Sequence, residues 1–335
     1  MVASMSNVSE PILEVRNLHT SFFTSEGEVK AVNGVSFTLE RGDILGIVGE
    51  SGSGKSAMVL SILRLIDEPG RITFGQILFK GRDILEMSGK ELRAIRGKDI
   101  AMIFPEPETA LNPTLRVGLQ VAEAVFSHMA VGRRAAFARG LEVMQEVRIP
   151  SAASRLRSYP HQFSGGMRQR VVIAMGLANE PSILIADEAT TALDVTVQAQ
   201  VLDLLRDLKR RRDMAIIAVT HNMGVVAGLC TRVIVMYAGQ IVEAGSVTEV
   251  LRDPQHPYTW LLMRAMPRVD SDRGQPLAAI AGAPPDLAAN LVGCKFSSRC
   301  PFRIARCVVD EPPLTELGDG HRAACWVTMN RALKK

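Results

Sequence analysis

The segment Gly49-Glu50-Ser51-Gly52-Ser53-Gly54-Lys55-Ser56 decides the fold class of this chain. It fits the pattern G-x-x-x-x-G-K-S/T, in which glycines let the backbone curl so that successive N–H groups point at phosphate oxygens. An apolar run, Ile44–Val48, precedes the segment, and a helical pattern, Ala57–Leu65, follows it. A buried strand, a glycine-rich loop and a helix in this order predict a phosphate-binding site in an α/β fold.

The roles of the loop residues follow from the chemistry of a bound nucleotide. Lys55 should neutralise the β- and γ-phosphates of a bound nucleotide, and the Ser56 hydroxyl should bind Mg²⁺. The helix that begins near Gly54 should direct the positive end of its dipole at the same phosphates. The residues predicted to bind ATP in this loop are Gly49, Ser51, Gly52, Ser53, Gly54, Lys55, Ser56 and Ala57.

Further apolar runs extend the α/β pattern along the chain. Strands are predicted at Ile12–Val15, Val35–Leu39, Ile183–Ala186 and Ala215–Thr220, and a hairpin is predicted at Val233–Gly245. A long helical pattern, Val197–Arg211, separates two of these strands, and the segment from Pro105 to about Ser158 is helical and amphipathic. This order predicts a parallel sheet that is interrupted by a helical insertion.

Length, composition and charge limit the class of protein. The chain has 335 residues, of which 47% are apolar and 22% charged, so we expect one large domain with an appendage and no extensive disorder. The net charge of +4 is small for this length and predicts no nucleic-acid partner. The basic run Lys209–Arg212 is expected to be a solvated helix end.

The sequence also leads to an expectation about location. It contains no run of about 18 apolar residues, so no transmembrane helix is expected. The N-terminal segment Met1–Pro11 is polar and contains Glu10, unlike the apolar core of a signal peptide. We therefore expect a protein of the cytoplasm, where thiols stay reduced.

A second motif narrows the class of nucleotide-binding protein. The segment Phe163-Ser164-Gly165-Gly166-Met167 resembles the LSGGQ signature of the ABC transporter ATPases, although its first and last positions differ. In that family, the signature of one subunit caps the γ-phosphate held by the other subunit. The resemblance therefore assigns Ser164, Gly165 and Gly166 to a nucleotide site shared with a second, homologous ATPase.

The resemblance also gives roles to polar residues that follow two of the predicted strands. Ile183–Ala186 runs into Asp187 and Glu188, whose carboxylates suit Mg²⁺ binding by the first and polarisation of the attacking water by the second. His221 follows the strand Ala215–Thr220 and matches the switch histidine that contacts the γ-phosphate. We predict that Glu188 and His221 are the catalytic residues.

The resemblance implies a domain layout and a site for the adenine. Residues 1–253 should form an ABC-type P-loop NTPase core with a mixed sheet and a helical subdomain at about 105–175, followed by a small C-terminal extension over 254–335. Phe22, in preference to Phe23, matches the aromatic residue that stacks on adenine. Packing of Phe22 in the core is the alternative.

One position departs from the family pattern. After the strand that ends near Phe104, the family has a glutamine that touches both Mg²⁺ and the membrane subunit, whereas this chain has Pro105. Proline supplies no side-chain amide and stiffens the loop. ATP should still bind. The link between the nucleotide state and the movement of this loop is the property that the missing amide puts in question. Glu106 is a candidate for an indirect metal ligand.

Two segments point to one branch of the family. Thr109–Pro113 and Asp253–Thr259 resemble segments of the ATPases of dipeptide and oligopeptide importers. The resemblance implies two membrane permeases, a second ATPase and an external solute-binding protein as partners, with this chain peripheral on the cytoplasmic face of the inner membrane. Nickel and glutathione are alternative solutes. A catalytically weak, structural subunit paired with an active ATPase is the alternative function.

The C-terminal extension carries four cysteines. Cys294, Cys300, Cys307 and Cys325 are separated by five, six and seventeen residues, without the C-x₂-C pairs common in structural zinc sites. The arrangement resembles the tail of some dipeptide-importer ATPases, whose cysteines hold a 4Fe–4S cluster. Zinc and free or disulfide-forming thiols are the alternatives.

Overall fold

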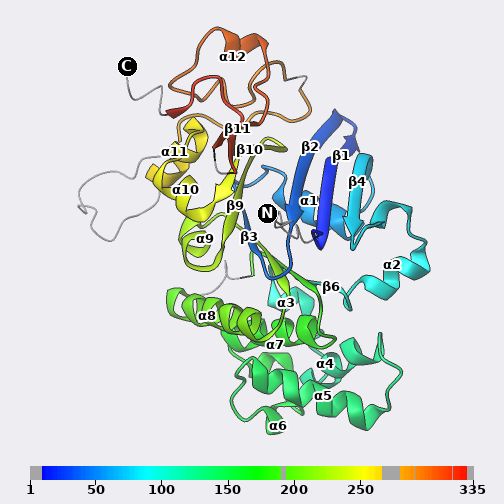
Figure 1. The fold of residues 1–335 in the computed structure, drawn as a ribbon. Helices are drawn as coiled ribbons and strands as arrows, with labels where there is room; N and C mark the ends of the chain where they lie inside the picture. The colour runs from blue at the N-terminus through cyan, green and yellow to red at the C-terminus, as the bar shows by residue number, and fades with distance from the viewer. Residues whose placement is uncertain (1–9, 190–193, 266–279, 290, 319, 330–335) are drawn as a thin grey trace, which may run out of the picture.

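The computed structural model describes residues 10–189, 194–265, 280–289, 291–318 and 320–329, and its elements are labelled in Figure 1. In this part of the chain, the main sheet has eight strands in the order β11-β12-β10-β9-β3-β8-β7-β6. They are β3 (Ile44–Val48), β6 (Ile100–Ile103), β7 (Ile183–Asp187), β8 (Ala215–Thr220), β9 (Arg232–Tyr237), β10 (Gln240–Ser246), β11 (Thr315–Gly318) and β12 (His321–Ala323).

The main sheet is mixed, as expected. Its neighbours β9-β3, β3-β8, β8-β7 and β7-β6 are parallel, whereas β9, β10, β12 and β11 pair antiparallel. Every residue of β3, β7 and β8 is buried, which explains their continuous apolar runs. The predicted hairpin is β9 followed by β10, with the turn at Ala238 and Gly239.

A second, antiparallel sheet corrects the prediction for the N-terminal segment. Its order is β2-β1-β4-β5, formed by β1 (Leu13–Thr24), β2 (Gly27–Leu39), β4 (Gly70–Phe79) and β5 (Arg82–Asp83). The strands predicted at Ile12–Val15 and Val35–Leu39 were therefore too short and were not assigned to a separate sheet. Bulges after Val15 and Thr20 interrupt the alternation of apolar and polar residues that would have revealed the full length of β1.

The helices of the described residues are labelled in Figure 1. They are α1 (Lys55–Ile62), α2 (Gly89–Ile95), α3 (Pro107–Ala110), α4 (Val117–Phe126), α5 (Arg133–Glu146), α6 (Ala152–Arg155), α7 (Gly165–Leu177), α8 (Val195–Arg211), α9 (Met223–Leu229), α10 (Val247–Arg252), α11 (Pro257–Arg264) and α12 (Arg306–Val309), with 3₁₀ turns at Ile84–Glu86 and Pro160–Gln162. Helices α3 to α7 lie between β6 and β7 in the chain and form the end of the molecule opposite the C-terminal extension.

Alternate residues of the central strands enter two hydrophobic cores. Leu184 and Ile216 pack with residues of α4, α5, α7 and α8. Ile185 and Ile217 face the opposite way and pack with α1 and the antiparallel sheet. Since successive side chains of a strand point to opposite faces, this division holds the central strands between two layers. No helix in the described ranges is long and apolar enough to cross a membrane.

The extension joins the main sheet through a buried carboxylate. Glu243 on β10 is fully buried and accepts hydrogen bonds from the backbone N–H groups of Gln255 and His256 at 2.6 and 3.0 Å. His321 on β12 lies with its Nε2 2.7 Å from the same carboxylate. This hydrogen bond raises the pKa of His321, so a positive charge on the imidazole favours the docked extension.

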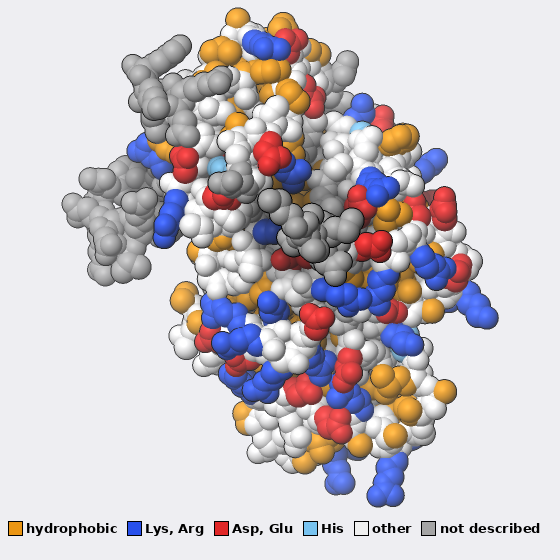
Figure 2. Space-filling model, viewed as in Figure 1, with side chains coloured by type: hydrophobic (Ala, Val, Ile, Leu, Met, Phe, Trp, Pro, Cys, Tyr) orange, Lys and Arg blue, Asp and Glu red, His pale blue; other side chains and the backbone are white. Residues whose placement is uncertain are grey.

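The basic run at the end of α8 is paired with acidic side chains. Arg210 forms an ion pair with Asp207, and Arg212 lies 2.6 Å from a carboxylate oxygen of Glu146. In Figure 2, cationic side chains over this part of the molecule are interspersed with acidic ones. This arrangement agrees with a solvated helix end rather than a track for phosphates.

Candidate nucleotide-binding site

The topology brings four loops to one edge of the main sheet. The last residue of β3, Val48, pairs with Thr220 at the end of β8, and Val219 pairs with Asp187 at the end of β7. The end of β6 lies beside β7, because Ile103 pairs with Ala186. The loops that follow these parallel strands therefore meet, and such an edge is where open α/β sheets bind ligands.

The phosphate loop follows β3 and curls between neighbouring backbone segments. Gly49 and Gly54 have φ angles of 155° and 98°. A Cβ atom on Gly49 would lie 2.3 Å from the carbonyl oxygen of Met236, and one on Gly54 would lie 2.1 Å from that of Ala31. The positive φ at Gly54, and the close neighbours of both glycines, explain why glycine is needed at these positions.

The Lys55 side chain donates hydrogen bonds to the backbone of its own loop. Its Nζ donates hydrogen bonds of 2.9 Å to the carbonyl oxygens of Gly49 and Glu50. The side chain is buried, and burial lowers its pKa, while the carboxylates of Glu188, Asp187 and Glu50 oppose that change. The ammonium is thus held at the centre of the loop, where it can transfer its hydrogen bonds to phosphate oxygens.

Ser56 and Asp187 supply oxygen ligands beside the loop. The Ser56 hydroxyl donates to Oδ1 of Asp187 at 3.3 Å. Burial raises the pKa of Asp187, and the hydrogen bond from Ser56 opposes the rise. A hydroxyl and a carboxylate next to a phosphate site suit Mg²⁺, which takes one or two protein oxygens together with phosphate oxygens and waters.

Glu188 and His221 lie together at the ends of β7 and β8. The Nδ1 atom of His221 is 3.3 Å from Oε1 of Glu188. Glu188 has a φ of 46°, in the left-handed region that non-glycine residues rarely adopt, and its N–H donates to Val219 at 2.9 Å. Such backbone strain gathers at functional sites, because the surrounding structure must hold the residue in place.

A cleft of about 690 Å³ lies at this edge of the sheet, and neither Asp187 nor His221 is among its described lining residues. Phe22, Lys55, Ser56 and Glu188 line it, whereas Phe23 is 42% exposed and lies under the Arg71 guanidinium. Other lining residues were not predicted, because they carry no phosphate-binding signature. They are Val29 and Ala31 of β2, Pro105, and Pro284, Pro285, Asp286 and Leu287 of the extension.

The signature residues lie apart from this cleft. Ser164 caps α7 by accepting the Met167 N–H at 3.4 Å, and Gly165 faces open space. A Cβ atom on Gly166 would lie 2.4 Å from a methyl carbon of Val197, so packing within this chain requires that glycine. None of the three is among the described residues that line the cleft.

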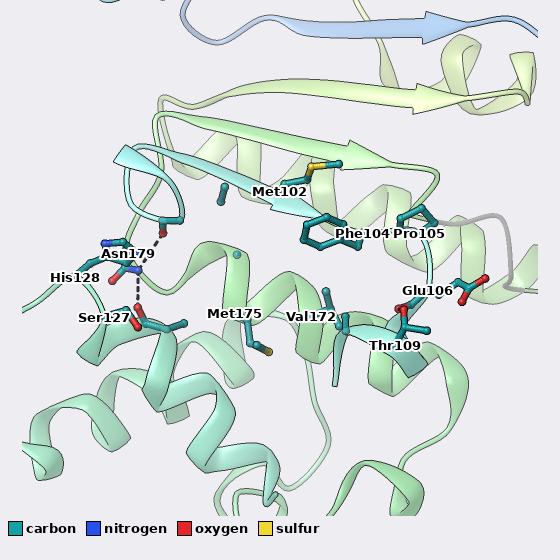
Figure 3. A pocket seen from close by; sticks show the side chains of 15 residues that line it. Met102, Phe104, Pro105, Glu106, Thr109, Ser127, His128, Val172, Met175 and Asn179 are labelled. Atoms are coloured by element: carbon teal, nitrogen blue, oxygen red, sulfur yellow. Dashed lines mark hydrogen bonds between the residues drawn. The ribbon is translucent and has the colours of Figure 1, made fainter. Parts of the chain in front are cut away.

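A groove of about 680 Å³ lies next to the cleft, between β6 and α7 (Figure 3). Phe104, Pro105 and Glu106 follow β6 along one wall, and Val172 and Met175 of α7 form another. Asn179 fixes the inner end by donating to the carbonyls of Gly97 and Ala124 at 3.0 and 2.8 Å. Pro105 borders both the groove and the nucleotide cleft, whereas Glu106 lines the groove alone.

The structure describes all four cysteines of the extension as free thiols. Burial raises the pKa of the Cys300 thiol to about 11 and that of Cys325 to about 12. The backbone N–H of Cys294 donates to the carbonyl of Cys307 at 2.9 Å, which joins two of the four cysteine positions. Among the described residues, however, no three His, Cys, Asp or Glu side chains are arranged to hold a metal ion. The structure therefore does not support the predicted metal centre in the described part of the extension.

Family models match two parts of the chain. The ABC transporter model matches residues 32–191, and the model of the oligopeptide/dipeptide transporter C-terminal region matches residues 242–307. The first match spans the phosphate loop, the signature and the carboxylates after β7. The second begins in β10 and continues through three of the four cysteines.

Curated relatives match over nearly the full length. The chain is 49% identical to the oligopeptide transport ATP-binding protein of Bacillus subtilis, covering 94% of this chain and 88% of that protein. It is 50% identical to the dipeptide transport ATP-binding protein of the same organism, covering 96% of both. Among solved structures, a dimeric ATP-binding cassette in a post-hydrolysis state with ADP and Pi matches with a TM-score of 0.63 and 27% identity, covering 70% of this chain and 98% of that one.

Proposed function

Because the chain belongs to the family of ABC transporter ATP-binding proteins for oligopeptides and dipeptides, we propose that it hydrolyses ATP to drive the uptake of such peptides through a membrane. The observation that carries the proposal is the convergence of five side chains at one edge of the sheet. Lys55 and Ser56 follow β3, Asp187 ends β7 and Glu188 follows it, and His221 follows β8.

Each of these side chains has a chemical task in the proposed reaction. Lys55 holds the β- and γ-phosphates, and Ser56 with Asp187 holds the Mg²⁺ that neutralises them. Glu188 orients and deprotonates the attacking water, and its contact with His221 keeps both groups beside the γ-phosphate. Phe22, which also lines the cleft, stacks on the adenine.

The proposed nucleotide site is completed by a second ATPase subunit. Support comes from Ser164, Gly165 and Gly166, which begin α7 away from this chain's own cleft and leave Gly165 facing open space. A partner's signature would approach this cleft, while the signature of this chain would approach the partner's. The helix N-terminus behind Ser164 would then direct N–H groups at the partner's γ-phosphate.

We assign the groove beside β6 to a membrane permease at the cytoplasmic face of the inner membrane. Two permeases and an external solute-binding protein complete the proposed importer. Pro105 supports the assignment, because it borders both the groove and the nucleotide cleft and can transmit a change in one to the other. The apolar walls formed by Phe104, Val172 and Met175 suit a protein partner.

Replacing Pro105 with glutamine should tighten the coupling of hydrolysis to transport. A side-chain amide could contact Mg²⁺ on the cleft side and the permease on the groove side. We expect fewer ATP molecules consumed per peptide imported, measured with the complete importer in vesicles. Pro113→Gln, at an exposed position outside both cavities, is the matched control. An unchanged ratio in Pro105→Gln would mean that this loop does not limit coupling here.

The transported solute is tested by uptake. The complete importer in vesicles should accumulate a labelled dipeptide only when ATP is supplied, and a non-hydrolysable analogue should not support uptake. Nickel and reduced glutathione are the competing solutes. Uptake of either of them without uptake of di- or oligopeptides would contradict the proposed solute while leaving the ATPase assignment intact.

The cysteine region of the extension is proposed to hold a 4Fe–4S cluster. Support comes from the number of cysteines in the extension, which equals the four thiolate ligands of such a cluster, and from the 2.9 Å backbone hydrogen bond that joins Cys294 to Cys307. The raised pKa values of Cys300 and Cys325 mean that ligation would release protons from these thiols. A cluster would tie the segment around α12 to the region near β12.

The cluster proposal predicts a coloured protein. Protein purified without oxygen should be brown and should contain about four irons and four sulfides per chain. Cys300→Ser should remove the colour and destabilise the extension, while nucleotide still binds because residues 49–56 form the phosphate loop. Cys230→Ser is the matched control, because this partly buried thiol lies outside the extension. Colourless wild-type protein with one zinc per chain would contradict the cluster.

A further inference from the structure

Arg299 of the extension is bound directly to the phosphate loop. Its Nη1 and Nη2 atoms donate to the two carboxylate oxygens of Glu50 at 2.6 and 3.0 Å. Glu50 is the second residue of the loop, and its N–H donates to the Tyr258 hydroxyl at 2.8 Å. The Arg299 side chain is only 4% exposed and the Glu50 side chain 27% exposed, so the guanidinium side of this two-fold ion pair is shielded from water.

The same guanidinium holds the chain that leads from the extension to the cleft. Nε donates to the Ala281 carbonyl at 3.0 Å, and Nη2 donates to the Ile280 carbonyl at 3.3 Å. Nη1 also contacts the Tyr237 hydroxyl at 3.3 Å. These five contacts match the five N–H donors of a guanidinium. A lysine could not make all of them, because its ammonium has three donors.

Three residues after Ala281, the chain reaches the nucleotide cleft. Pro284, Pro285, Asp286 and Leu287, called the cleft segment below, line the cavity that also contains Phe22 and Lys55. Asp286 stabilises the turn by accepting the Ala288 N–H at 2.9 Å. Leu287 is half-buried and packs against the core that contains Tyr258 and Phe296. The segment is therefore fixed to the extension on one side and faces the cleft on the other.

The chemistry of the cleft segment suits a nucleoside and not a phosphate. Lys55 is the only cationic side chain among the described residues that line the cleft. The segment offers two prolines and a leucine for contact with a flat base, and its one ionisable group, the acidic Asp286, would repel phosphate oxygens. Carboxylate oxygens of this kind accept hydrogen bonds from ribose hydroxyls.

We propose that the cleft segment is part of the ATP site and contacts the base and ribose of the nucleotide, and that Arg299 is the positioning residue that holds it there. This inference rests on the proposed function, because it requires the phosphates to bind at Lys55. It makes the extension a component of the nucleotide site, joined to the phosphate loop through Glu50.

The test compares ADP with pyrophosphate, which has the phosphates but lacks the nucleoside. Both are titrated calorimetrically, with Mg²⁺, into the full-length chain. Leu287→Ala should weaken ADP binding about tenfold and leave pyrophosphate binding unchanged, because the apolar surface that it removes from the cleft would contact the nucleoside and not the phosphates. Val292→Ala, at a 65% exposed position of the extension outside the cleft, should change neither.

Arg299→Gln should also lower the affinity for ADP relative to the affinity for pyrophosphate, as Leu287→Ala does. If Arg299 acts through the cleft segment, adding Leu287→Ala to Arg299→Gln should weaken ADP binding by much less than tenfold. Unchanged ADP affinity in Leu287→Ala, or an equal loss of ADP and pyrophosphate affinity in both variants, would overturn the inference. Lys55→Ala tests the proposed function separately from this inference. Unchanged pyrophosphate binding in that variant would contradict the proposed phosphate site.

Discussion

Replacing Lys55 with alanine should abolish ATP hydrolysis by this subunit and sharply reduce its affinity for ATP. The Lys55 ammonium is held at the centre of the phosphate loop by the carbonyls of Gly49 and Glu50, where no other cation lines the described part of the cleft. Loss of a preorganised group that stabilises developing charge costs roughly 10²–10³ in turnover. We expect a loss at least this large, because substrate binding also suffers.

Two measurements make the Lys55→Ala result specific. ATP binding is measured with the isolated full-length chain, and phosphate release is measured with the complete importer. Lys90→Ala, at an exposed position on α2, should change neither quantity. Hydrolysis at the parental rate in Lys55→Ala would mean that this loop does not hold the phosphates of the reacting nucleotide.

Glu188→Gln should separate ATP binding from hydrolysis. The substitution keeps the size of the side chain and leaves the loop, Ser56 and Asp187 in place, so ATP should bind as before. It removes the carboxylate that lies 3.3 Å from His221 and is proposed to activate water. Turnover should fall by about 10²–10⁴, the range attributed to a positioned general base.

The retained nucleotide distinguishes this effect from a loss of structure. Protein isolated after incubation with labelled ATP and Mg²⁺ should carry uncleaved ATP in Glu188→Gln and mainly ADP in the parental chain. Glu86→Gln, at an exposed position outside the cleft, is the matched control. If the isolated Glu188→Gln protein carried mainly ADP, as the parental chain does, another group would be the general base.

The strands and loops of the nucleotide site could be predicted because each has a local signature. The apolar runs that became β3, β7 and β8 are buried along their whole length, so their composition alone reveals them. Gly49 and Gly54 follow from the backbone shape that the loop needs. Phe22 was placed by resemblance, and it lines the cleft while Phe23 does not.

The parts that could not be predicted depend on contacts between residues far apart in the chain. The antiparallel sheet pairs β1 with both β2 and β4, and bulges hide its alternation of apolar and polar residues. Arg299 is one basic residue in a segment rich in cysteine and proline, and nothing local indicates that it binds Glu50, 249 positions earlier. The cleft segment was missed for the same reason.

An active subunit and a structural subunit differ in which nucleotide site hydrolyses ATP, this chain's own site or that of the partner ATPase. Every side chain proposed to contact phosphate, metal or water in this chain's own site is present at the same sheet edge. The Glu188 carboxylate lies 3.3 Å from the imidazole of His221, the arrangement proposed for activation of water. We therefore expect this chain's own site to hydrolyse ATP.

The measurement that tests this most directly is phosphate release by the complete importer with Glu188→Gln confined to this subunit. The comparison is an importer in which only the partner ATPase carries the matching change. We expect the change in this subunit to reduce both hydrolysis and peptide uptake by about 10²-fold or more. Intact hydrolysis and uptake with Glu188→Gln here, together with loss of both when the partner is changed, would contradict catalysis by this chain.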